Sequence, residues 1–160
     1  MPSNILFIMA DEHQQKAVGC YDHPFVKTPT IDKLAQSGTR FTNAYTNSPI
    51  CVPARASFAT GREVHEIGYW DNAHAYDGRI EGWGHLMQKA GMHCLSIGKL
   101  HYRLREDPTG FNEQIVPLHI VEGIGGINGS IKRPLAPPIK NSKIATEIGP
   151  GESGYTRYDR

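Results

Sequence analysis

The sequence predicts an α/β domain with a largely parallel sheet, because short apolar segments alternate with segments of helical spacing. The apolar segments are residues 4–10 and 92–98, and the helical ones are residues 29–37, 53–60 and 80–90. The chain has 160 residues, about one domain's worth, of which 39% are hydrophobic and 21% charged. That composition favours a folded core and excludes disorder throughout.

The first apolar segment, residues 4–10, ends abruptly at two acids, Asp11 and Glu12. An uninterrupted run of this length is typical of a parallel strand covered on both faces. No basic segment precedes it, so we interpret it as a strand and not as a secretory leader. Without a leader, three widely spaced cysteines favour a reduced, cytoplasmic setting over a disulfide framework.

The first helix is expected to begin at Pro29 and to end just before Gly38. Thr28 is a typical N-cap residue, Pro29 suits the first helical position, and Gly38 suits the C-cap. Residues 39–46 follow with aromatic side chains among threonines, a composition that suits a second strand.

A short helix at residues 53–60 is predicted from Pro53 near its start, and apolar residues at helical spacing predict another at residues 80–90. The segment 92–98 suits a buried strand. Residues 123–160 contain seven glycines and four prolines in 38 positions, so an irregular segment is expected there, after a structured part at residues 1–122.

Charge excludes two classes of partner. Seventeen Lys and Arg against sixteen Asp and Glu give a formal charge of +1, which offers no electrostatic footprint for nucleic acid or for a membrane surface. No apolar run approaches the roughly 20 residues that span a bilayer.

Three groups of residues are candidates for chemistry. Asp11 and Glu12 follow a predicted strand, and ligands collect at the carboxyl ends of strands in open α/β sheets. Adjacent carboxylates there suit a hard cation. The alternative is that they are solvated loop acids or helix caps.

Cys51 precedes the helix expected from Pro53, and a helix N-terminus attracts anions. Arg55 lies four residues further on, so it can share a face with Cys51. A nucleophile beside a guanidinium suits sulfate or phosphate; the alternative is a buried small cysteine and a surface arginine. A cysteine-dependent phosphatase loop is excluded, because it needs arginine where Ser57 stands.

Lys99 and His101 follow the strand expected at residues 92–98. Residues two apart in extended chain point to the same side, so both could reach one pocket. Lysine would supply positive charge and histidine a proton donor or acceptor. The alternative is two ordinary surface residues.

Together these segments resemble the N-terminal part of the sulfatase family, within the alkaline phosphatase superfamily, and look most like its choline-sulfatase and phosphonate monoester hydrolase members. The four matching segments stand in the family's order. They are residues 4–11; residues 28–35 with Gly38 and residues 41–45; Cys51-Val52-Pro53-Ala54-Arg55 with Thr60-Gly61-Arg62; and Gly98-Lys99-Leu100-His101.

The resemblance implies the N-terminal portion of an α/β/α sandwich, with residues 1–122 as part of the catalytic domain. Cys51 would be oxidised by a formylglycine-generating enzyme, and the formylglycine hydrate would be the nucleophile. A divalent cation would be held by Asp11, Glu12 and the modified Cys51; calcium is the expected ion, with Mn²⁺ and Mg²⁺ as alternatives.

The resemblance also assigns roles to the remaining candidates. Arg55 would hold the hydrate, and Lys99 and His101 would contact the sulfate, with His101 also catalytic. The implied activity is hydrolysis of a small-molecule sulfuric ester. The alternatives are a phosphodiester or phosphonate monoester hydrolase, and a truncated, non-catalytic anion-binding protein.

The family's second metal-binding pair is expected beyond residue 160, so the chain is expected to be an N-terminal segment of the domain. Exposed sheet edges in such a segment would favour a homo-oligomer.

Overall fold

The computed structural model describes residues 4–120 and residue 123. The chain divides into two compact units, Met1–Thr46 and Asn47–Arg160. The irregular segment expected at residues 123–160 lies outside the described residues, apart from Gly123. Within the described ranges, no helix combines the length and apolar character needed to cross a membrane.

The first unit is built around α1 (Pro29–Ser37), with two 3₁₀ turns before it, η1 (Gln15–Ala17) and η2 (Gly19–Tyr21). Helix α1 has the predicted bounds, and the Gly38 N–H caps it by donating to the Leu34 carbonyl at 2.9 Å. Asp32 in its first turn accepts hydrogen bonds from the Thr28 hydroxyl at 2.8 Å and the Cys20 N–H at 2.7 Å. The helix start is therefore tied to η2.

The strand predicted at residues 4–10 is absent from this structure, as is the one at residues 39–46. All of residues 4–10 are exposed; Leu6 is 85% and Ile8 77% accessible. An apolar run signals a tendency to be buried, but a strand also needs neighbouring backbone to satisfy its N–H and C=O groups. Within the described part of the chain, the two strands that form pair with each other.

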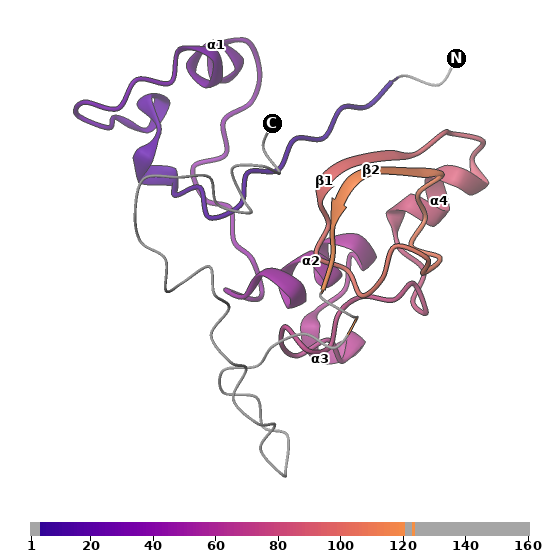
Figure 1. The fold of residues 1–160 in the computed structure, drawn as a ribbon. Helices are drawn as coiled ribbons and strands as arrows, with labels where there is room; N and C mark the ends of the chain where they lie inside the picture. The colour runs from indigo at the N-terminus through magenta and orange to yellow at the C-terminus, as the bar shows by residue number, and fades with distance from the viewer. Residues whose placement is uncertain (1–3, 121–122, 124–160) are drawn as a thin grey trace, which may run out of the picture. The chain divides into compact units, whose positions relative to one another are not determined.

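The second unit contains those two strands, β1 (Leu95–Lys99) and β2 (Glu113–Leu118), which run parallel and side by side (Figure 1). Ladder partners include Ile97 with Ile115, and the register shifts between Ile97 and Lys99. Gly98, at φ +88°, occupies that irregularity, where a side chain would be strained. The parallel pairing agrees with the α/β prediction. Strand β1 begins three residues later than expected, and β2 was not predicted because Pro117 and Glu113 obscure its pattern.

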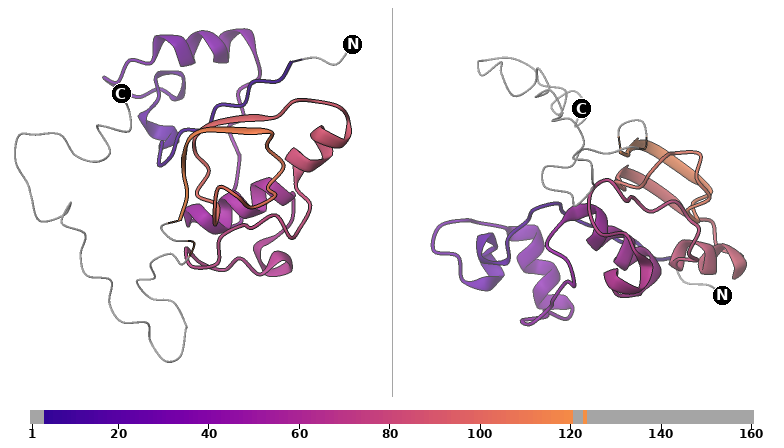
Figure 2. Two further views of the ribbon diagram at one scale, coloured as in Figure 1. Left: turned by 45° about the vertical axis from the view of Figure 1, so that its right-hand side comes forward. Right: turned by 90° about the horizontal axis from the view of Figure 1, so that it is seen from below.

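Among the described residues of this unit, three helices accompany the strands: α2 (Cys51–Thr60), α3 (Val64–Ile67) and α4 (Trp83–Lys89). Figure 2 shows β1 and β2 again as neighbours. Helix α2 starts two residues before the predicted start. Because the first N–H groups of a helix have no intrahelical acceptor, Pro53 fits as its third residue without losing a hydrogen bond.

The core of this unit is aromatic and joins the helices to the chain after β1. The cluster comprises Ala56, Ala59, Ile67, Tyr69, Tyr76 and Tyr102. The Tyr76 and Tyr102 rings meet edge to face with centroids 4.9 Å apart, and the Tyr76 hydroxyl donates to the Ile80 carbonyl at 2.7 Å. Burial raises the pKa of Tyr76 to about 12, so its hydroxyl stays a donor at physiological pH. Ala56 and Ala59 belong to the C-terminal half of α2, so this core holds that half of the helix in place.

Candidate functional site

Cys51 is the first residue of α2 and is half-buried. Its thiol donates to Oδ1 of Asn72, with 3.5 Å between sulfur and oxygen. The same oxygen accepts the Val52 N–H at 3.3 Å, one of the helix-terminal donors that have no intrahelical acceptor. One amide oxygen therefore anchors both the candidate nucleophile and the N-terminus of its helix.

Asn72 was not singled out from the sequence. It stands 21 positions after Cys51, in a connection with no helical or strand periodicity. The one local signal is the Asp71-Asn72 pair, a composition typical of tight turns. Such a pair indicates that the chain reverses direction, but it does not indicate which residues the turn contacts.

Arg55 lies one turn into α2 and is buried, with 8% of its surface accessible. Its guanidinium donates to the Lys99 carbonyl at 2.7 Å. The sequence left open whether this arginine lay on the surface; the structure places it inside. The bond brings the helix that carries Cys51 to the carboxyl end of β1, where Lys99 is the last residue.

His101 follows two residues later, and its backbone departs from the extended conformation on which the pairing with Lys99 was predicted. Its φ is +56°, in the left-handed region that histidine enters more readily than most residues. The alternation rule therefore does not carry past Lys99. The backbone N–H of His101 still donates to the Leu118 carbonyl at 2.8 Å, so His101 remains at the carboxyl end of the strand pair.

Asp11 and Glu12 belong to the first unit, and both are exposed. Within the described residues, no three His, Cys, Asp or Glu side chains converge on a metal position. Adjacent carboxylates do supply the oxygen ligands that a hard cation takes, but such a cation takes six or more. The pair fits a partial cation site that needs further ligands.

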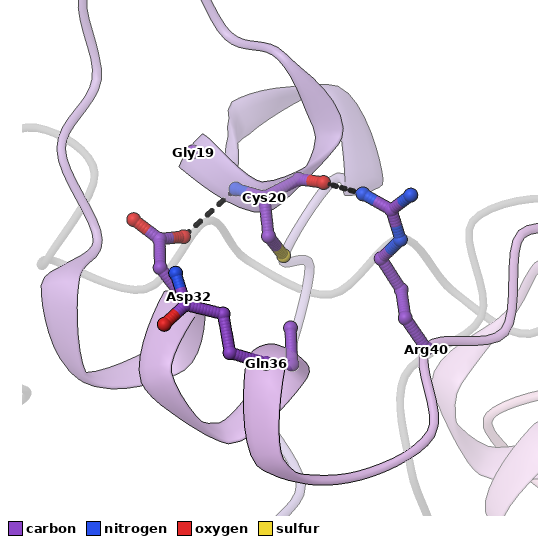
Figure 3. A pocket seen from close by; sticks show the side chains of 6 residues that line it. Gly19, Cys20, Asp32, Gln36 and Arg40 are labelled. Atoms are coloured by element: carbon purple, nitrogen blue, oxygen red, sulfur yellow. Dashed lines mark hydrogen bonds between the residues drawn. The ribbon is translucent and has the colours of Figure 1, made fainter.

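A hollow of about 460 Å³ lies in the first unit, lined by Gly19, Cys20, Asp32, Ala35, Gln36 and Arg40 (Figure 3). Its charged groups bind the protein's own backbone: Asp32 accepts the Cys20 N–H and Arg40 donates to the Cys20 carbonyl. The hollow is therefore explained by η2 packing against α1.

His85 lies in the first turn of α4 and has a structural role. Its Nδ1 accepts the Gly82 N–H at 3.1 Å at the start of α4, and Nε2 donates to the Pro108 carbonyl at 2.6 Å. Both ring nitrogens serve the fold.

Comparisons with known proteins place this geometry in context. The family model for Sulfatase matches residues 3–124. An N-acetylglucosamine-6-O-sulfatase of Bacteroides thetaiotaomicron is 38% identical over 109 residues, which cover 68% of this chain and 19% of that protein. A choline-sulfatase of Rhizobium meliloti is 36% identical over 112 residues, covering 70% and 22%.

A solved structure, BT4656 in complex with its substrate D-glucosamine-2-N,6-O-disulfate, is 36% identical with a TM-score of 0.64. The match covers 69% of this chain and 22% of that one. The chain thus spans about a fifth of the length of the proteins it matches.

Proposed function

The chain belongs to the sulfatase family, and from that premise we propose that the protein hydrolyses sulfuric esters with Cys51 as the precursor of its nucleophile. One observation carries the proposal. Cys51 is the first residue of α2, and its thiol donates a hydrogen bond to Asn72. Arg55 on the same helix is buried and donates to the carbonyl of the last residue of β1. The second unit thereby brings together the position of the nucleophile, the buried guanidinium of Arg55 and the carboxyl end of a parallel strand.

The nucleophile requires oxidation of Cys51 to formylglycine by a modifying enzyme. The hydrated aldehyde supplies two hydroxyls, one to attack sulfur while the alcohol leaves, and one to expel sulfate and regenerate the aldehyde. The contact with Asn72 supports this assignment, because an acceptor 3.5 Å from Sγ can also accept from a hydroxyl on the same carbon. Asn72 would then orient the attacking group.

Arg55 would hold the formylglycine hydrate, and its positive charge would also stabilise the negative charge that develops on the sulfate. A guanidinium offers planar, fixed N–H donors that match sulfate oxygens, and burial strengthens its attraction for an anion. The bond to the Lys99 carbonyl holds the guanidinium in one position before substrate arrives, which is the preorganisation that electrostatic catalysis needs. Lys99 and His101 would contact the sulfate from the end of β1.

Sulfatases generally use a divalent cation. Asp11 and Glu12 would contribute carboxylate oxygens to it, and we propose calcium as the ion. Such an ion would screen the charge of the sulfate and make a bound hydroxyl more acidic.

The test begins with the mass of the tryptic peptide that contains position 51, from protein made with and without a formylglycine-generating enzyme. The expected result is conversion of Cys51 to the aldehyde, with hydrolysis of 4-nitrophenyl sulfate only in the converted protein. Cys51→Ala should abolish turnover. Full activity from protein whose Cys51 remains a thiol would refute the mechanism.

Substrate class is tested by parallel assays. N-acetylglucosamine 6-sulfate and choline sulfate follow the relatives' names, and a 4-nitrophenyl phosphodiester tests the alternative activity. Faster hydrolysis of the phosphodiester than of every sulfate ester would make the protein a phosphodiesterase on the sulfatase scaffold.

A further inference from the structure

The turn Asp71–His74 lies against the first turn of α2 through contacts on both sides of His74. Before it, Asn72 accepts from the Cys51 thiol and the Val52 N–H. After it, Ala75 is buried in a cluster with Val52, against which Cys51 packs. The backbone at His74 therefore passes between two contacts to the helix start that carries the nucleophile.

The ring of His74 is held by a carboxylate. Oδ1 of Asp71 lies 2.9 Å from Nδ1 of His74 and also accepts the Ala73 N–H at 2.8 Å. The His74 N–H donates to the Asp71 carbonyl at 3.0 Å and closes the turn. Because a carboxylate only accepts, Nδ1 carries the hydrogen, and in the neutral ring Nε2 is the acceptor nitrogen.

Stability does not account for this arrangement. The His74 side chain is 43% accessible and that of Asp71 is 21%. A pair of neighbouring side chains that water still reaches contributes little to folding. The Asp71 carboxylate also accepts the Ala73 N–H, and the His74 N–H donates to the Asp71 carbonyl, so the turn closes without the ring.

We propose that His74 contacts the alcohol half of the sulfate ester, with Nε2 accepting a hydrogen bond from a substrate hydroxyl. Asp71 is the positioning residue that fixes the ring. The site would then favour esters of hydroxylated alcohols, such as sugars, over aryl esters that carry no hydroxyl. This inference rests on the proposed function and deepens it by naming the substrate class.

The experiment uses the protein purified from its source with Cys51 converted, and two esters, N-acetylglucosamine 6-sulfate and 4-nitrophenyl sulfate. His74→Phe keeps a ring of similar size without the nitrogen. It should lower kcat/KM for the sugar sulfate by roughly tenfold, mainly through KM, and change the aryl sulfate less than twofold. Asp71→Ala should shift the same ratio in the same direction by a smaller factor.

The matched control is His93→Phe, since His93 is an exposed histidine before β1; it should leave both rates unchanged. Thermal unfolding of each variant confirms that it folds. Equal losses on both esters, or no loss on either, would overturn the inference and leave the proposed function intact. If the unsubstituted protein hydrolyses neither ester, the proposed function fails and the inference falls with it.

Discussion

The guanidinium of Arg55 donates to the backbone carbonyl of Lys99 at 2.7 Å, although 44 positions separate the two residues. The acceptor is main chain, so the contact depends on where β1 ends and not on the lysine side chain. It couples the helix that presents Cys51 to the strand end that presents Lys99. Disturbing it should therefore affect both folding and turnover.

Arg55→Ala should lower kcat/KM by about 10²-fold or more, because a preorganised donor to the sulfate is lost. It should also lower the free energy of unfolding by about 1–3 kcal/mol, the usual cost of an unsatisfied buried acceptor. Arg105→Ala is the control, since Arg105 also donates to a carbonyl, that of Gln114 at 3.1 Å, from an exposed position. Equal activity in the two variants would remove Arg55 from the site.

Asn72 allows stability and catalysis to be separated. Asn72→Asp keeps an acceptor oxygen for the Val52 N–H, so unfolding by urea should change little. The added negative charge beside the nucleophile would repel sulfate, and kcat/KM should fall at least tenfold. Asn72→Ala removes the acceptor and should cost about 1 kcal/mol of stability. Unchanged turnover in the Asp variant would mean that Asn72 is only a helix anchor.

Gly110 packs where no side chain fits. Its φ is +88°, and a Cβ there would lie 2.4 Å from the backbone nitrogen of His85 in α4. Gly110→Ala should therefore destabilise the second unit by about 2–4 kcal/mol, from overpacking and strain together. Gly91→Ala is matched, because Gly91 has φ +79° with open space around it. It should cost about 1 kcal/mol, the strain alone. Similar melting temperatures for both variants would contradict the packing.

His119 should make stability depend on pH. Burial lowers its pKa in the folded protein, and Nε2 contacts Oε1 of Gln114 at 2.7 Å. Above the unfolded-state pKa of about 6.5 the ring is neutral in both states and contributes no pH dependence. As the pH falls below that value the unfolded chain takes up the proton more readily, so the free energy of unfolding falls.

Urea unfolding between pH 7.5 and pH 5.5 measures this effect. His119→Gln, which cannot titrate, should flatten the profile, whereas His93→Gln at an exposed site should not. An unchanged slope in the His119 variant would assign the pH dependence to other groups.

Local patterns in the sequence were enough to predict the bounds of α1 and to predict that Cys51 and Arg55 lie about one helical turn apart on α2. Thr28, Pro29 and Gly38 define a helix through contacts within four positions, and α1 has the predicted bounds. The four positions between Cys51 and Arg55 span about one turn of any helix. The motifs around these residues also predicted the family, which the match over residues 3–124 confirms.

The apolar run at residues 4–10 shows what local sequence patterns cannot predict. Its composition predicts burial, but a strand is completed by a partner that composition does not name. Likewise the alternation from Lys99 to His101 assumed an extended backbone, and the left-handed φ of His101 interrupts it.

Only the tertiary structure decided that Asn72 binds the Cys51 thiol and that Arg55 is buried on the Lys99 carbonyl. These contacts join residues 21 and 44 positions apart. Caps and helical spacing act between neighbours in the chain and can be identified from them. A long-range contact forms only when packing of the whole unit brings its two ends together, so no local pattern encodes it.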